Sequence, residues 1–516
     1  MSSLLDEKRL SPVEEEPLRP RPHRTLHLLA AVLAPIALLA FVLQLHPAFV
    51  YSTTAARPAH LHPHTSPAAA AIDWSWLAPE KQCPGLQGIG QDEFTARRTQ
   101  LAELLKGEDG KSWGAYVSEP GPNTLYYANL TQSDWYLSER PWLLVITPST
   151  SDTHSSRLSI LTPSFEVSRS QRLPFALSSA EFESVSWVAW EEAEDPYATL
   201  VAHLEELRGK DGINSEGWSI HLEENVRQFV ASGLAAAVKE KEGVEVGLAS
   251  IEVRQQRMRK TKAELNIQHC VAKITRVALR AVREHLRIGM TEKEGEALIV
   301  NALTAGGLKD LGAIVLFGAN AALPHASASV HKRLEHGEFA LFDVDGSLHG
   351  YMSDFTRTML PDIHTRSCHG FGKPKILQQW PSARAEKIWK TVHKAQEAAL
   401  AALVNQNDTH VVYATDADRA ARGVIAEEGW EKYFTHRLGH GIGLQVHEEP
   451  YLNSGNTHQP LLSGFTFSNE PGIYIREDED TEGNGIGVRL EDMVLKTERG
   501  WSLVAREELA KSPWEP

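Results

Sequence analysis

Three aspartates, Asp343, Asp345 and Asp354, lie among apolar residues in the segment FDVDGSLHGYMSDFTRT, residues 342–358. Charged side chains are rarely buried without a partner, because removing a charge from water is costly. Asp343 and Asp354 are 11 residues apart with glycines between them, so a β-hairpin can bring both carboxylates to one patch of a sheet. Two carboxylates that close repel each other unless a cation lies between them. The spacing therefore predicts a metal site.

Further candidate ligands follow in equally apolar or glycine-rich surroundings. They are His436, His440 and His447 in HRLGHGIGLQVHEEP, Glu470 in SNEPGIY and Glu491 in VRLEDMVL. Any one of the carboxylates alone is most simply a surface residue or a member of a salt bridge. Four carboxylates and one imidazole together form a hard, oxygen-rich set that suits Mn²⁺, with Zn²⁺, Co²⁺ or Fe²⁺ as alternatives. The set holds enough ligands for two divalent ions bridged by a water molecule.

These residues belong to five motifs that occur in a fixed order. The motifs are PHASAS with His325, D-x(10)-D, GHGIGLQVHE, NEPGIY and RLED with Arg489. In this order they resemble the pita-bread metallopeptidases, most closely the Xaa-Pro dipeptidases (prolidases) and aminopeptidase P. The resemblance covers about residues 255–505, and the region before it resembles, more weakly, the N-terminal domain of the creatinase type.

The resemblance implies a role for each of these side chains. Asp343 would chelate one metal ion, Asp354 and Glu491 would bridge both ions, and His440 and Glu470 would complete the second. His325, His436 and His447 would line the substrate site. Glu470 would also accept a proton from the bridging water, which then attacks the scissile carbonyl. His436 and His447 would stabilise the oxyanion or pass a proton to the leaving nitrogen, and Arg489 would orient Glu491 or the substrate.

The implied activity is that of a metal-dependent exopeptidase acting on peptides with proline in the second position. The motifs do not separate a dipeptidase from an aminopeptidase, although THRLGHGIGLQVHE, residues 435–448, favours the dipeptidases. A methionine aminopeptidase would lack the preceding domain, and a creatinase-like hydrolase would not need the five ligands. The alternative from another class is an inactive pita-bread module that binds peptides or proteins from a membrane anchor.

One residue departs from the family pattern. Asp345 occupies the position at which the family usually has glycine, two residues after the first ligand. We expect its side chain to point away from Asp343, either to solvent or to an arginine.

The surrounding elements predict two domains. Between residues 91 and 254, short apolar runs such as PWLLVITP alternate with helical patterns such as PYATLVAHLEEL, which predicts an α/β domain with a partly parallel sheet. From residue 255 to 516 we expect an α+β pita-bread domain with helices on a largely antiparallel sheet. The basic segment RQQRMRKTKAELN links the two, and Thr261 and Thr291 begin capping boxes with glutamates three residues later.

The N-terminal region predicts a membrane anchor. The uncharged run LLAAVLAPIALLAFVL, residues 28–43, is long enough with its flanks to span a bilayer as a signal anchor over residues 26–46. Arginines precede it, so residues 1–25 would be a disordered cytoplasmic tail and the rest would face a lumen or the exterior. Residues 47–90 read as a stalk. The alternative is a secreted protein whose signal peptide is cleaved. Sequons at Asn129 and Asn407 fit either case.

Charge and cysteine content narrow the classes of partner. The formal net charge of −15 argues against a nucleic-acid binder, which needs clustered basic residues. Three cysteines, Cys83, Cys270 and Cys368, are too few for a disulfide framework or a cysteine zinc cluster, and Cys270 is expected to be a small core residue rather than a reactive thiol. The family resemblance implies a homodimer formed partly through the N-terminal domain.

Overall fold

The computed structural model describes the chain from residue 72 onward with short gaps. The described ranges are 72–106, 113–150, 155–212, 217–365, 375–404, 411–481, 483–506 and 508–516. The chain divides into two units, residues 1–59 and 60–516, and every described residue lies in the second. The predicted tail and membrane span, Asn407 and Cys368 lie outside the described residues. Within the described part of the chain, no helix is long and apolar enough to cross a membrane.

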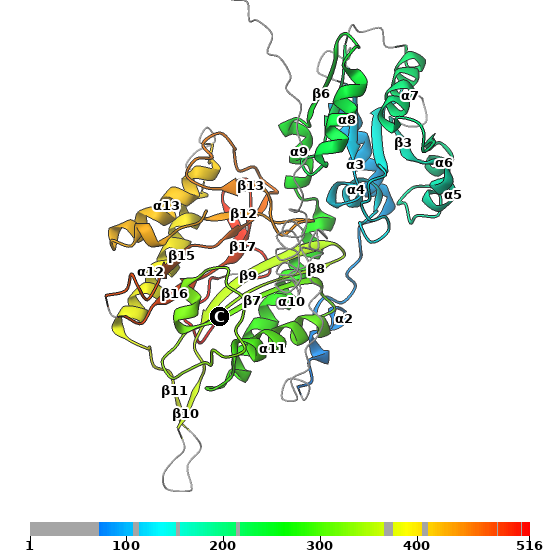
Figure 1. Ribbon diagram of the computed structural model, residues 1–516. Coiled ribbons are helices and arrows are strands. Elements are labelled where there is room, and N and C mark those ends of the chain that lie inside the picture. Colours follow the sequence, from blue (N-terminus) through cyan, green and yellow to red (C-terminus); the bar gives the residue numbers. More distant parts are fainter. Residues whose placement is uncertain are drawn as a thin grey trace, which may run out of the picture. The chain divides into compact units, whose positions relative to one another are not determined.

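The N-terminal domain is built on a six-stranded sheet with the strand order β4-β3-β2-β1-β5-β6 (Figure 1). Strands β3 and β4, β1 and β5, and β5 and β6 pair in parallel, and the other two pairs are antiparallel. The strands are β1 Gly114–Ser118, β2 Leu143–Pro148, β3 Ser156–Pro163, β4 Ser186–Trp190, β5 Trp218–Leu222 and β6 Val244–Leu248. The helices are α3 Gln91–Leu104, α4 Pro122–Ala128, α5 Val167–Ser170, α6 Ser179–Glu183, α7 Pro196–Lys210, α8 Gln228–Val238 and α9 Ile251–Met258.

Alternation along the strands gives this sheet two apolar faces. In β1, Ala115 and Val117 pack in the core formed with α7 and α8, whereas Tyr116 packs in the core formed with α3 and α4. Successive side chains of a strand point to opposite faces, so helices must cover both sides. The domain is therefore an α/β layer structure with a mixed sheet, as the apolar runs predict.

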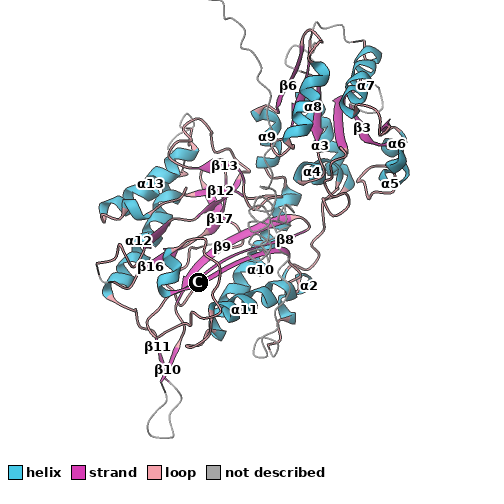
Figure 2. Ribbon diagram, in the orientation of Figure 1, coloured by secondary structure: helices cyan, strands magenta, loops and turns pink. Residues whose placement is uncertain are grey.

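The described part of the C-terminal domain combines four long helices with two larger antiparallel sheets and two strand pairs (Figure 2). One larger sheet has the order β7-β8-β9 and the other the order β13-β12-β14-β17-β18, and the strand pairs are β10-β11 and β15-β16. The strands are β7 Lys309–Phe317, β8 Ala340–Leu348, β9 Tyr351–Met359, β10 Ile363–Thr365, β11 Lys375–Leu377, β12 Gly439–Gly441, β13 Glu448–Leu452, β14 Thr466–Asn469, β15 Gly472–Ile475, β16 Ile486–Arg489, β17 Asp492–Lys496 and β18 Trp501–Leu503. The helices are α10 Lys262–His285, α11 Glu292–Ala305, α12 Ala383–Ala402 and α13 Ala414–Glu427.

Two apolar cores hold this domain together. Helices α10 and α11 pack on β7, β8 and β9, and α12 and α13 pack on the strands from β14 to β17. Both predicted capping boxes are present: the hydroxyls of Thr261 and Thr291 accept hydrogen bonds from the backbone N–H of Glu264 and Glu294. Satisfying these N–H groups fixes where α10 and α11 begin.

The β8–β9 hairpin has a two-residue turn at His349 and Gly350. Both residues have positive φ, 49° and 82°, which is the geometry of a type I′ turn that suits twisted antiparallel strands. The turn places Asp345 opposite Asp354 and Asp343 opposite Thr356. Register at the turn thus decides which carboxylates share a face.

The end of the predicted stalk is folded onto the C-terminal domain. Trp74 and Leu77 are buried in the core around α10. This segment forms two short elements, η2 Ser75–Leu77 and α2 Pro79–Gln82. Cys83 and Cys270 form a disulfide. Cys270 lies in the core around α10, as expected, but it is also cross-linked to a segment 187 residues away, which the sequence analysis does not predict.

Candidate metal centre

Four carboxylates and one imidazole converge where the two sheets of the C-terminal domain meet. Asp343 lies in β8, Asp354 in β9 and His440 in β12, while Glu470 follows β14 and Glu491 separates β16 from β17. Three groups of side chains have ligand atoms within 4.8 Å of one another. The groups are Asp343, Asp354 and Glu491; His440, Glu470 and Glu491; and Asp354, His440 and His447.

The carboxylates of this centre are close enough to repel one another. Burial and the nearby Glu491, Asp343 and Asp345 raise the pKa of Asp354 well above its usual range. Burial and the neighbouring acids likewise raise the pKa of Glu491. The Oε1 atom of Glu491 is buried without a hydrogen-bond partner among the described residues, whereas Oε2 accepts a 2.7 Å bond from the hydroxyl of Thr356.

The fourth carboxylate, Glu470, is held in its ionised form. Burial alone would raise its pKa, but the hydrogen bond and charge of His440, with His436 and Arg489, lower the pKa of Glu470 to about 2. The His440 Nε2 atom lies 3.1 Å from Glu470 Oε1 and 3.6 Å from Asp354 Oδ2. An imidazole nitrogen between carboxylate oxygens is a usual ligand arrangement for a divalent cation. The orphaned Glu491 oxygen and the excess of acid therefore fit cations at this centre.

Asp345 belongs to the same acidic patch, so the expectation that it points away from Asp343 is wrong. Residues two apart on a strand share a face, and Asp345 lies directly opposite Asp354. Burial and the charge of Asp343 raise the pKa of Asp345 to about 7. Its carboxylate occupies the space that a side chain at Gly312 would need, since a Cβ there would lie 2.0 Å from Asp345 Oδ2. No arginine pairs with Asp345 among the described residues.

Arg489 pairs with Asp343 rather than with Glu491. Its Nη2 lies 2.5 Å from Asp343 Oδ2, its Nε donates to the hydroxyl of Thr356 and its Nη1 donates to the hydroxyl of Tyr474. The side chain is buried, and the planar fork of its guanidinium fixes Asp343 and Tyr474 at once. The expected role of orienting Glu491 is thus met only indirectly, through Thr356.

Tyr474 is a member of the site that the motif analysis does not single out, although it lies within NEPGIY. Its hydroxyl lies 2.8 Å from His436 Nε2 and also accepts the bond from Arg489. His436 Nδ1 lies 2.7 Å from the carbonyl oxygen of Arg437, which can only accept. The proton of His436 is therefore on Nδ1, and Tyr474 donates to Nε2. Burial lowers the pKa of His436, which agrees with this neutral form.

The two remaining histidines lie at exposed positions. The His447 ring is 4.1 Å from that of His440, and desolvation with the charges of His440 and Arg437 lowers the pKa of His447 to about 4. His325 lies in the loop after η4 Gly318–Ala322, which is tied to the site because the carbonyl of Pro324 accepts from Arg489. The structure thus gathers the five candidate ligands and His447, with His325 outside the three ligand groups.

Comparisons with known proteins identify a family of peptidases. Residues 267–498 match the model of metallopeptidase family M24. An uncharacterised peptidase of Schizosaccharomyces pombe is 36% identical over 433 residues, which are 83% of this chain and 84% of that protein. The crystal structure of the dipeptidase PepE from Mycobacterium ulcerans has a TM-score of 0.63 at 28% identity and covers 82% of this chain and 99% of its own. A prolidase from Thermococcus sibiricus has a TM-score of 0.60 at 25% identity, with coverage of 80% and 98%.

Proposed function

The chain belongs to metallopeptidase family M24 and has its pita-bread fold, and from this premise we propose that it is an exopeptidase that hydrolyses Xaa-Pro dipeptides with two divalent metal ions. The observation that carries the proposal is the overlap of the ligand groups. Glu491 belongs both to the group of Asp343 and Asp354 and to the group of His440 and Glu470. A carboxylate shared in this way can bridge two ions, most simply Mn²⁺, with Zn²⁺, Co²⁺ or Fe²⁺ as alternatives.

The ions would supply an activated water as the nucleophile and neutralise the charge of the acids. Glu470, which its low pKa keeps ionised, can accept the proton of that water. Neutral His447 keeps one ring N–H, which can donate a hydrogen bond to the oxyanion that develops on the scissile carbonyl. Arg489 holds Asp343 and Tyr474 in place, and Tyr474 in turn fixes the ring of His436.

Arg437 supports a dipeptide as the substrate. Its guanidinium carbon lies 4.7 Å from the centre of the Tyr451 ring, and Tyr451 lies opposite the ligand His440 on paired strands. Opposite residues of an antiparallel pair share a face, so this arginine lies beside the metal centre. Arg437 is half-buried, and among the described residues its guanidinium faces the Tyr451 ring and forms no ion pair with an acid. A free terminal carboxylate next to the proline would supply that partner.

Hydrolysis of three matched peptides tests the proposal. The purified full-length chain would be assayed with Ala-Pro, Ala-Pro-amide and Ala-Pro-Ala, with Mn²⁺ and with chelator. We expect Mn²⁺-dependent cleavage of Ala-Pro, and KM about 10-fold or more higher for the amide, because one charge-assisted hydrogen bond contributes about 1.5–3 kcal/mol. Replacing Arg437 with alanine should raise KM for Ala-Pro and leave the amide unchanged.

A matched control is Arg476→Ala, which removes an exposed arginine that pairs with Asp478 and should change neither substrate. Equal, negligible turnover with Mn²⁺ and with chelator would refute the peptidase. Efficient cleavage of Ala-Pro-Ala and of the amide would instead identify an aminopeptidase.

We propose further that the described part of the chain faces an oxidising lumen or the exterior. The disulfide between Cys83 and Cys270 supports this, because such bonds persist mainly in oxidising compartments. The sequon at Asn129 lies in an exposed position just after α4, where an N-linked glycan would meet no buried surface. A mass loss on enzymatic deglycosylation that Asn129→Gln abolishes would support this placement, and cysteines found reduced in the native protein would contradict it. The membrane anchor and the homodimer stay predictions.

A further inference from the structure

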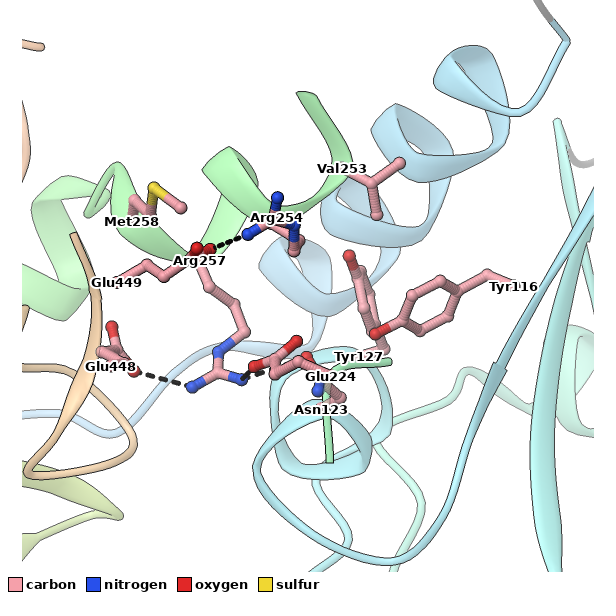
Figure 3. A pocket seen from close by; sticks show the side chains of 10 residues that line it. All are labelled: Tyr116, Asn123, Tyr127, Glu224, Val253, Arg254, Arg257, Met258, Glu448 and Glu449. Atoms are coloured by element: carbon pink, nitrogen blue, oxygen red, sulfur yellow. Dashed lines mark hydrogen bonds and ion pairs between the residues drawn. The ribbon is translucent and has the colours of Figure 1, made fainter. Parts of the chain in front are cut away.

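The basic segment between the two domains meets a pair of acidic residues next to the metal centre. Arg254 and Arg257 lie on α9, and Lys260 lies just after it. Glu448 and Glu449 begin β13, directly after His447. Arg254 pairs with Glu449 and Arg257 pairs with Glu448 (Figure 3). Lys260 also pairs with Glu448.

Arg257 contacts both domains at once. On one side its Nη1 lies 3.2 Å from Asn123 Oδ1 and 3.3 Å from Glu224 Oε1, both in the N-terminal domain. On the other side its Nη2 donates to Gln445 Oε1 at 2.9 Å and to Glu448 Oε2 at 2.7 Å. Figure 3 shows the guanidinium lying between Glu448 on one side and Glu224 and Asn123 on the other. One rigid fork thus joins the N-terminal domain to the segment that carries His447.

Glu448 fixes the backbone on either side of His447. Lys260 donates to its Oε1 at 2.9 Å, and the backbone N–H of Gln445 lies 3.4 Å from its Oε2. Its carboxylate fills the space beside Gly443, where a Cβ would lie 2.2 Å from Oε1. The residues before and after His447 are therefore held by the same carboxylate.

The packing around this ion-pair cluster leaves little freedom. Arg257, Lys260 and Glu448 are 8%, 5% and 6% exposed. The cavity lined by Arg257, Glu448, Tyr116 and Tyr127, among others, has a volume of about 20 Å³, which is room for one water molecule. A buried ion pair adds little net stability compared with apolar residues of the same volume, so its value can lie in fixing geometry.

We propose that Arg257 is a positioning residue that, through Glu448, holds His447 at the metal centre and makes its position depend on the N-terminal domain. The inference rests on the proposed role of His447 in peptide hydrolysis. His447 is an exposed side chain on a loop between two short strands, and the contacts of Gln445 and Glu448 with Arg257 restrain that loop from both ends. A displacement of about 1 Å at a catalytic group can cost about 100-fold in rate.

The test compares Arg257→Met with Arg257→Lys in the full-length chain. The first readout does not need activity: the imidazole signals of ¹³C-labelled histidines are recorded, and His447→Ala identifies the His447 signal. We expect Arg257→Met to shift or broaden that signal and to lower kcat/KM for Ala-Pro by about 10–100-fold, with unchanged metal content. Arg257→Lys should restore part of both. In a chain that already carries His447→Ala, adding Arg257→Met should lower kcat/KM by less than about a further twofold, because both substitutions remove the same function, that of His447.

Arg98→Met is the matched control, since Arg98 is also buried and its hydrogen-bond and ion-pair partners among the described residues lie in the N-terminal domain. It should lower thermal stability and leave the His447 signal unchanged. A wild-type His447 signal in Arg257→Met, or losses that add fully to those of His447→Ala, would overturn the inference. If Arg257→Met does not fold, Arg257→Lys decides, because it keeps the charge but not the second N–H donor. If Arg257→Met loses the His447 signal but the wild-type protein shows no peptidase activity, only the proposed function is refuted, and the positioning role of Arg257 stands.

Discussion

Buried carboxylates of the N-terminal domain lie against guanidinium groups, whereas those of the metal centre gather around a single arginine. Glu181 Oε1 lies 2.6 Å from Arg98, and Glu119 Oε1 lies 2.6 Å from Arg227. At the metal centre, Arg489 pairs with Asp343, and the other three acids have no arginine or lysine partner among the described residues. The first region balances its own charge, and the second does not.

Glu223 is a buried carboxylate of the N-terminal domain that does not pair with an arginine among the described residues. It is buried, accepts bonds from the Glu119 N–H and the Asn123 amide, and burial raises its pKa to about 7. A lone buried acid can keep its proton at little cost. Asp354 and Glu491 lie close together without an arginine or lysine partner among the described residues, while the adjacent Glu470 stays ionised beside His440. Protonation of one acid does not account for this group, so the imbalance favours a metal site over structural stabilisation.

The largest expected effect comes from removing the shared ligand. Glu491→Gln keeps the shape and the bond from Thr356 but loses the negative charge that can bridge two cations. We expect kcat/KM for Ala-Pro to fall by about 1,000-fold or more, because under the proposed function both ions would lose a ligand at once. Metal content per chain, measured by mass spectrometry, should fall in parallel. A Glu491→Gln variant with full metal content and wild-type turnover would contradict the inference that the unbalanced acids serve to bind metal.

Breaking a balanced pair should affect stability instead of activity. Glu181→Gln leaves Arg98 buried without its partner, and such losses cost about 3–5 kcal/mol. The midpoint of denaturant unfolding should therefore fall, while kcat at a temperature below unfolding stays at the wild-type value. A loss of turnover in soluble, folded Glu181→Gln protein would show that the N-terminal acids also serve the chemistry.

The pH dependence should separate the metal-free and metal-loaded proteins. The pKa values of Asp354 and Glu491 are raised in the folded metal-free chain, so folding there favours their protonated forms. Their contribution to stability is greatest below the ordinary carboxyl range and is lost as the pH rises through the raised pKa values. We expect the increase in Tm on adding Mn²⁺ to grow from about pH 5 to pH 8. A difference that does not change with pH would contradict this.

Local patterns in the sequence predict much of the fold. The capping boxes at Thr261 and Thr291 depend on contacts within a few residues and appear where the sequence places them. The candidate ligands could be recognised in the sequence because each is a titratable residue in an apolar or glycine-rich run. The structure brings them together. Their roles as ligands stay predictions.

Features that depend on distant pairing could not be predicted. The partner of Cys270 is 187 residues away, and three cysteines do not define a pairing. The bond of Arg489 to Asp343 requires β16 to lie across β8, which no local pattern encodes. Asp345 is different, because the two-residue period of a strand already places it on the face of Asp343.

The smallest expected effect, at Asp345, decides whether this extra acid belongs to the metal centre or only lies beside it. Asp345→Asn keeps the size of the side chain and its position against Gly312 but removes a charge whose pKa is raised to about 7. Folding favours the protonated form of Asp345, so the asparagine should raise the Tm of the metal-free protein above pH 7 and leave it unchanged near pH 4. It should weaken Mn²⁺ binding by about 10-fold at most. The carboxylate of Asp345 is partly buried, and its attraction for the ions, where solvent screens it, contributes on the order of 1 kcal/mol. At saturating Mn²⁺, turnover should then equal that of the wild type. A loss of turnover that excess Mn²⁺ does not restore would make Asp345 a ligand in its own right, and the acid in place of the family's glycine would then extend the metal centre.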